Sequence, residues 1–202
     1  MGVKSRHFFR TLGVLATVAI FTVLFGTAAV VSQNKADTGK KLDPREVADL
    51  FHAIVSANRA VYSQVVVNRL MLQDKVINAS EHFLKEKGLP LPAQLFRLGA
   101  ELAAEKDRRV FYSLHSYWPL NKQNAPRTKT EKNGLSYVTV KDKNFYGEEE
   151  IDGVTYFIAV YPDRATDQSC VTCHNNHKDS PRRNFEIGEV MGGVVIRIPL
   201  SN

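Results

Sequence analysis

Residues 169–174 read Ser-Cys-Val-Thr-Cys-His and contain both cysteines of the 202-residue chain. Cys170, Cys173 and His174 form the pattern C-x-x-C-H, which is the attachment signature of a c-type haem. Two thiols at this spacing can add to the two vinyl groups on one edge of a porphyrin, and the next imidazole then reaches the iron. The pattern therefore predicts one covalent haem c, with His174 as an axial iron ligand and the rest of the domain wrapped around it.

Three other chemistries use the same residue types. A zinc site of Cys170, Cys173, His174 and His177 would need neighbouring residues 173 and 174 to ligate one ion, which strains a tetrahedron. A thioredoxin-like dithiol would need its first cysteine at the start of a helix after a strand, whereas loop-like residues 162–169 precede the motif. A local disulfide in an oxidising compartment is the plainest alternative.

Composition bounds the class of protein. A chain of 202 residues, of which 44% are apolar, is long enough for one well-packed domain with an appendage. The formal charge of +6 includes Lys4, Arg6 and Arg10, which precede the first apolar run. The remainder is nearly balanced in charge, so the sequence lacks the footprint of a nucleic-acid-binding protein. Two cysteines are too few for a disulfide-rich scaffold, so a core and a cofactor must hold the fold.

The N-terminal part of the chain predicts where the protein resides. Residues 11–32 carry no charge, and residues 12–31 are long enough to cross a bilayer as a helix. A cleaved signal peptide is the alternative, because residues 27–29 are small and resemble a cleavage site. Basic residues flank the span on both sides and leave its orientation open. Bacterial c-type haem is attached outside the cytoplasmic membrane, and this requires the domain to be outside.

We therefore expect a single-pass protein of the bacterial inner membrane. Its membrane anchor would comprise residues 1–32, a polar linker residues 33–42, and a periplasmic haem domain residues 43–202. A long amphipathic helix begins this domain, with Asp43 as N-cap and Pro44 in the first turn. Apolar residues at helical spacing predict its inward face: Val47, Leu50, Phe51, Ile54, Val61, Val65, Leu72 and Val76. The middle of this helix is apolar nearly all round, so a second helix or the partner of a homodimer would cover it.

The periodicity changes after this helix. A second helix is expected over residues 92–106, with Leu95, Leu98 and Leu102 inward. Runs rich in β-branched and aromatic residues predict strands, and they are residues 110–114, 136–140, 155–160 and 190–198. The pairs at 133–134 and 152–153 are read as turns, the second as a hairpin. Helices followed by a mostly antiparallel sheet give an α+β fold.

The chain also resembles a known family. The similarity lies in residues 89–93 (Leu-Pro-Leu-Pro-Ala), 116–121 (Ser-Tyr-Trp-Pro-Leu-Asn), the C-x-x-C-H motif and residues 188–195 (Gly-Glu-Val-Met-Gly-Gly-Val-Val), in this order after a long helix. Together they resemble the PAS-like c-type haem domain, long catalogued as a domain of unknown function, which occurs in cyanobacterial haem proteins and bacterial receptor sensors. The resemblance implies a PAS-like antiparallel sheet with flanking helices, covalent haem at Cys170 and Cys173, and His174 on the iron.

Two departures from the family shape the functional hypothesis. Some members use a cysteine of the N-terminal helix as the other axial ligand, and this chain has no third cysteine. The sixth position is therefore open to other residues or to water. Candidate residues are Tyr62 and Met71 on the long helix and His82 just after it, although each also has a plain role in packing or at the surface. Receptors of the family continue into a signalling module, whereas this chain stops at Asn202, so we expect no output domain.

Other residues near the motif receive structural interpretations. His52 is expected on the solvent side, His115 in the sheet, and His177 too close to the motif to reach the opposite face of a haem. Trp118 is expected to pack, or to contact the porphyrin edge. Five basic residues could pair with haem propionates or an acidic docking partner, although solvated charges are the plainer interpretation: Arg59, Arg127, Lys178, Arg182 and Arg183.

The sequence thus predicts a membrane-anchored, extracytoplasmic monohaem c-type cytochrome rather than an enzyme. It would transfer electrons to a redox partner protein, or sense a ligand or redox state through a signalling partner. Two alternatives remain. One is a haem enzyme acting on peroxide or a nitrogen oxide, and the other is an interaction domain without haem that contains a local disulfide.

Overall fold

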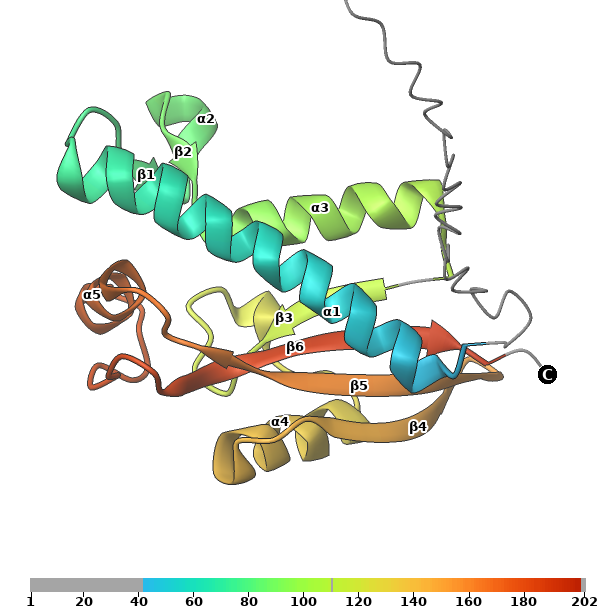
Figure 1. Ribbon diagram of the computed structural model, residues 1–202. Coiled ribbons are helices and arrows are strands. Elements are labelled where there is room, and N and C mark those ends of the chain that lie inside the picture. Colours follow the sequence, from blue (N-terminus) through green and yellow to red (C-terminus); the bar gives the residue numbers. More distant parts are fainter. Residues whose placement is uncertain (1–41, 110, 201–202) are drawn as a thin grey trace, which may run out of the picture. The chain divides into compact units, whose positions relative to one another are not determined.

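A computed structural model describes residues 42–109 and 111–200 of the chain. Its centre is a four-stranded antiparallel sheet in the order β3-β6-β5-β4, with helices on both faces (Figure 1). The strands are β3 (Phe111–His115), β4 (Phe145–Ile151), β5 (Val154–Arg164) and β6 (Val190–Pro199). The predicted α+β class is therefore confirmed.

Strands β5 and β6 read as nearly continuous apolar runs because both faces of the sheet are covered. Ala159, Tyr161, Val194 and Ile196 point to the side that contains α1 and α3. The alternate residues Ile158, Val160 and Val195 pack on the other side against α4. The predicted hairpin turn joins β4 to β5, and its residues Asp152 and Gly153 have φ values of 51° and 78°. Positive φ at both positions matches the twist of an antiparallel hairpin.

The predicted strand at residues 136–140 is wrong. These residues lie in α4 (Lys129–Lys141), whose N-cap Thr128 accepts a hydrogen bond from the Glu131 N–H at 3.2 Å. The pair at 133–134 is likewise no turn. Gly134 lies mid-helix because α4 passes so close to β5 that a Cβ atom there would stand 2.5 Å from Val160 Cγ2.

The predicted long helix is present, and its second part is wound more widely than an α-helix. It comprises α1 (Pro44–Val61) and the π-helix η1 (Tyr62–Gln73), which continues without a break. The predicted N-cap is confirmed, since the Asp43 side chain accepts from the Arg45 N–H at 2.7 Å. At the other end the Asp74 N–H donates to the Arg69 carbonyl at 2.8 Å, a five-residue separation typical of π geometry.

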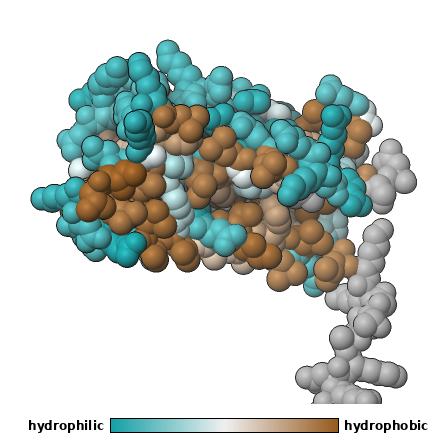
Figure 2. All heavy atoms as spheres, turned by 90° about the horizontal axis from the view of Figure 1, so that it is seen from above, coloured by the Kyte–Doolittle hydropathy of each residue, from teal (hydrophilic) through white to brown (hydrophobic). Residues whose placement is uncertain are grey.

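The predicted inward face of this helix is largely wrong. Leu50, Ile54, Val61 and Val65 are between 54% and 60% exposed. Of the predicted face, Phe51 does pack against the core. The rest of the buried side of α1 and η1 is formed by small or polar residues and two valines: Ala48, His52, Val55, Arg59, Ser63 and Val67. Small and polar side chains let the helix lie close to the sheet, and most of the larger apolar residues point away from it. Apolar side chains are spread over this side of the molecule in the view from above (Figure 2).

The remaining elements complete the described fold. They are β1 (Ala79–Ser80), α2 (Phe83–Glu86), β2 (Leu89–Pro90), α3 (Pro92–Lys106), the short η2 (Lys122–Asn124) and α5 (Gln168–Asn176). Helix α3 confirms the predicted second helix, but not its inward face. Phe96 is its buried residue, while Leu98 and Leu102 are exposed and Leu95 is half-buried.

Within residues 42–109 and 111–200, no helix combines the length and the apolar character needed to cross a bilayer. The predicted span at residues 12–31 and the competing signal peptide both lie outside the described residues. The same holds for nearly all of the predicted anchor and linker.

Candidate functional site

The C-x-x-C-H motif lies on helix α5, not in a loop. Asp167 caps this helix, accepting from the Ser169 N–H at 2.8 Å through its side chain and from the Cys170 N–H at 3.1 Å through its carbonyl. Strand β5 ends three residues before the cap, so the motif does stand after a strand and at the start of a helix. The sequence-based objection to a dithiol site is therefore wrong on this point. Helical winding holds Cys170 and Cys173 one turn apart.

Both cysteines are free thiols and half-buried. Burial raises the pKa of the Cys170 thiol and of the Cys173 thiol, so both stay protonated near neutral pH. A catalytic dithiol needs the opposite shift, because the thiolate is the nucleophile. The environment of these cysteines thus disfavours a thioredoxin-like role despite their place at a helix start.

His174 is half-buried beside Cys173. Burial lowers the pKa of its imidazole against the opposing effect of the Asp163 charge, which keeps the ring neutral near pH 7. Its Nδ1 atom is buried and has no hydrogen-bond partner within residues 42–109 and 111–200. The ring meets Phe185 edge-on, with centroids 5.9 Å apart. A neutral imidazole with a buried, unsatisfied nitrogen is suited to bind a further group.

An apolar cluster packs against this side of α5. Its buried members are Ala165, Phe185 and Met191, and the half-buried Trp118, Cys170 and Val171 lie against them. The Asn175 side chain forms two hydrogen bonds with the backbone of Phe185. Its amide N–H donates to the Phe185 carbonyl at 3.0 Å, and its oxygen accepts from the Phe185 N–H at 2.9 Å. The segment after α5 is thereby held against the motif.

Polar contacts tie α5 to elements far away in the sequence. The Asn68 amide on η1 donates to the Asp167 carboxylate at 3.0 Å. At the other end of α5, His177 Nε2 lies 3.5 Å from the Glu81 carboxylate, whose charge adds to the raised pKa of the Cys173 thiol. The motif is therefore bracketed by η1 on one side and by the segment after β1 on the other.

The three predicted distal ligands lie in different settings. The Tyr62 hydroxyl donates to the Pro90 carbonyl at 2.7 Å, Met71 is half-buried in η1, and His82 is exposed just before α2. Among the described residues, no hydrogen bond, ion pair or ring contact joins any of the three to His174.

The other predicted histidine positions give mixed results. His52 is not on the solvent side: its ring stacks on Tyr161 with centroids 3.9 Å apart and an interplanar angle of 6°. The error follows from the wrong helix face. His115 lies in β3 as predicted and is only 4% exposed. His177 forms the C-cap of α5.

Most of the five predicted basic residues already have protein partners. Arg59 forms an ion pair with Asp163, and neither side chain is more than 20% exposed. Arg182 pairs with Glu189 and lies over the Trp118 ring at 4.8 Å. The Arg183 side chain donates to the Lys178 carbonyl at 2.8 Å, and the Arg127 side chain donates weakly to the Gln123 carbonyl at 3.4 Å. Lys178, the fifth residue, is exposed.

Sequence reasoning missed several residues that shape the site. Asn68 and Glu81 reach the motif only through tertiary packing, and no local pattern identifies them. Asn175 and Phe185 could have been suspected from their nearness to the motif in the sequence. Within the part of the chain that the structure describes, no group of three or more His, Cys, Asp or Glu side chains could hold a metal ion, so the zinc alternative gains no support.

Comparison with known proteins gives a match over most of the chain. A family model described as "Tll0287-like: Tll0287" matches residues 35–199. The crystal structure of the cyanobacterial heme-protein Tll0287 is similar with a TM-score of 0.50 and 14% sequence identity, covering 80% of this chain and 99% of that chain. At this identity the likeness shows a shared fold. No curated protein matches.

Proposed function

The chain belongs to the Tll0287-like family, because the family model matches far more than half of the chain, and we propose that the protein is a monohaem c-type cytochrome. Cys170 and Cys173 would hold the haem covalently, and His174 would bind its iron. One observation carries the proposal: the C-x-x-C-H motif lies on α5, and the Nδ1 atom of its His174 is buried without a hydrogen-bond partner among the described residues. The solved relative Tll0287 is a cyanobacterial heme-protein, which supports the same assignment.

The residues present fit such a group. Each neutral thiol can add across one vinyl double bond, the sulfur to one carbon and the thiol hydrogen to the other, so no oxidant or reductant is consumed. Burial that keeps both thiols protonated also protects them from oxidation to a disulfide before attachment. The pKa of His174 is lowered, so its imidazole is free of a competing proton near pH 7.

The function that this arrangement favours is transfer of single electrons. A bound haem supplies a one-electron iron couple. Around it, Phe185 and Met191 would exclude water, Asn175 would hold the segment after α5 in place, and Asp167 would fix the start of the helix. Rigid surroundings from which water is largely excluded would limit structural rearrangement when the haem gains or loses an electron. Sensing through a separate signalling partner is the related role, and it would require a sixth iron position that can exchange.

We assign the sixth position to one of Tyr62, Met71 or His82. The Tyr62 hydroxyl would have to release its hydrogen bond to Pro90, whereas the side chains of Met71 and His82 have no hydrogen bond to lose among the described residues. Because Glu81 lies close to His177 at the end of α5, the neighbouring residue His82 also lies on a segment near α5. His82 is therefore the favoured candidate.

The wider setting of the domain follows from the sequence. We propose that residues 12–31 anchor it in the bacterial inner membrane, with the domain in the periplasm and a PAS-like fold. Its partners would be a redox protein or a signalling protein. A second copy of the chain would cover the exposed apolar face of α1 and η1, formed by Leu50, Ile54, Val61 and Val65.

Spectra of the purified protein in both redox states test this function. A low-spin spectrum that carbon monoxide leaves unchanged in the reduced protein indicates a carrier with two protein ligands. Rapid binding of carbon monoxide with a large shift indicates an open site and favours the sensor. In the first case, His82→Ala should open the site to carbon monoxide, while Tyr62→Phe and Met71→Leu should not.

A further inference from the structure

Strand β3 forms a free edge of the sheet. It pairs with β6 on one side, and no described strand pairs with its other side. Just past the strand, the outward-pointing Ser116 N–H donates to the Asn124 carbonyl at 2.9 Å. Because backbone direction alternates along a strand, Leu114 and Tyr112 also point their N–H and C=O groups away from β6. These groups form a short row of donors and acceptors that a further strand could use.

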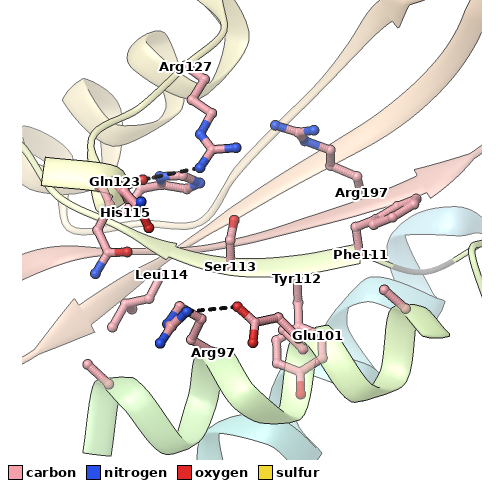
Figure 3. A pocket seen from close by; sticks show the side chains of 14 residues that line it. Arg97, Glu101, Phe111, Tyr112, Ser113, Leu114, His115, Gln123, Arg127 and Arg197 are labelled. Atoms are coloured by element: carbon pink, nitrogen blue, oxygen red, sulfur yellow. Dashed lines mark hydrogen bonds and ion pairs between the residues drawn. The ribbon is translucent and has the colours of Figure 1, made fainter. Parts of the chain in front are cut away.

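A groove follows this edge. Its volume is about 310 Å³, and it lies between β3, helix α3 and the segment around η2 (Figure 3). Helix α3 contributes Ala93, Ala100 and Ala104 to its wall, so short side chains leave the space beside the strand open. We call this space the β3–α3 groove. It lies apart from the C-x-x-C-H motif, none of whose residues line it.

The charge of the groove is positive. Arg97 is neutralised by Glu101 at 2.8 Å, and Arg197 is neutralised by the buried Glu131. Arg127 differs from both, because no carboxylate forms an ion pair with its side chain among the described residues. Figure 3 shows Arg127 across β3 from Arg97 and Glu101 of α3. An uncompensated guanidinium with free donors therefore stands beside the free edge.

We propose that the β3–α3 groove binds an extended acidic segment of a partner protein, which adds to the sheet as a strand beside β3. The extended form follows from the backbone groups of Tyr112 and Leu114, which a strand satisfies in sequence. The acidic character follows from Arg127. This goes beyond the proposed function and does not depend on haem, since no residue of the groove belongs to the motif.

Hydrogen–deuterium exchange of the full-length chain tests the proposal. The probe is an eight-residue acetylated peptide in which glutamate alternates with valine, supplied at millimolar concentration. We expect exchange of the backbone at residues 111–115 to slow several-fold. The same peptide N-methylated at every residue should give no protection, because it has no N–H group left to donate to the edge. Arg127→Gln should weaken binding about tenfold, whereas Lys129→Gln, an exposed cation outside the groove, should leave it unchanged.

Three outcomes would overturn the proposal. The first is unchanged exchange at β3 with saturating peptide. The second is equal protection by the N-methylated peptide, which would identify a site for acidic groups without strand addition. The third is protection of β3 that rises with protein concentration when no peptide is present, which would identify a second copy of this chain as the occupant.

Discussion

Glu131 is a fully buried carboxylate in the layer between α4 and the sheet. Its side chain pairs with Arg197 and accepts hydrogen bonds from the N–H groups of Arg127 at 2.7 Å and Thr128 at 3.2 Å. His115 Nε2 stands 3.8 Å away. Burial by itself would raise the pKa of Glu131, but these donors outweigh it and hold the pKa below its usual value. The carboxylate is thus an anchor between helix, loop and sheet.

Replacing this carboxylate should destabilise the fold. Glu131→Gln leaves Arg197 without its partner, and we expect a loss of up to about 3 kcal/mol at pH 7. The folded pKa lies below the unfolded value of about 4.3, so the unfolded chain binds more protons in acid. The contribution of this group is therefore complete above about pH 4.3 and falls as pH drops through the folded pKa. Urea unfolding at pH 7 and pH 4 measures both effects, and equal stability of variant and parent at pH 7 would refute the assignment.

Gly134 is the second residue whose identity the packing fixes. A Cβ atom at this position would stand 2.5 Å from Val160 Cγ2 and 2.9 Å from Phe145 Cδ1. Gly134→Ala should therefore cost about 1–3 kcal/mol, although alanine favours helices elsewhere. Ser136→Ala, on the exposed side of the same helix, is the control and should be neutral or slightly stabilising. Thermal unfolding of the two variants tests this prediction. A Gly134→Ala variant more stable than the Ser136→Ala variant would contradict it.

At the scale of elements, the sequence predicts helix α1–η1 but not which side of it is buried. The spacing of apolar residues predicts that the face with Leu50, Ile54 and Val61 is buried, but these three residues are exposed. The sheet instead receives Ala48 and Arg59, which permit close approach and an ion pair with Asp163. Helix α4 shows the converse error. Its β-branched residues suggest a strand, and tertiary packing around Gly134 overrides that propensity.

The exposed face of α1–η1 yields a prediction about assembly. Ile54→Lys combined with Val65→Lys should leave the unfolding free energy nearly unchanged, because both side chains already face solvent. If a second copy covers this face, the same substitutions should convert a dimer to a monomer. Val67→Ala, on the buried side of the same helix, should instead lower stability and leave the oligomeric state intact. Light scattering measures the oligomeric state of each protein. A parent protein that is monomeric at high concentration would contradict the predicted dimer.

For the molecule as a whole, the sequence contains a local signal for the chemistry of the site but none for the packing around it. Three residues in one helical turn carry the haem hypothesis, because their spacing is local. The packing of Phe185 on His174 depends on the course of the segment after α5, and the contact of Asn68 with Asp167 depends on how α5 meets η1. No local pattern encodes either. The hairpin at Asp152 is predicted correctly because its turn is a short-range signal.

Covalent attachment of haem is the central claim, and its most direct test is the intact mass of the denatured protein. The full chain is produced with a c-type maturation system and extracted with acidified acetone before mass spectrometry. We predict that the polypeptide retains the added mass of one haem, and that the double variant Cys170→Ala, Cys173→Ala loses it to the solvent. His174→Ala should keep the mass but shift the absorption spectrum. A parent chain that releases all its haem into the acetone, or that carries no haem at all, would contradict the account.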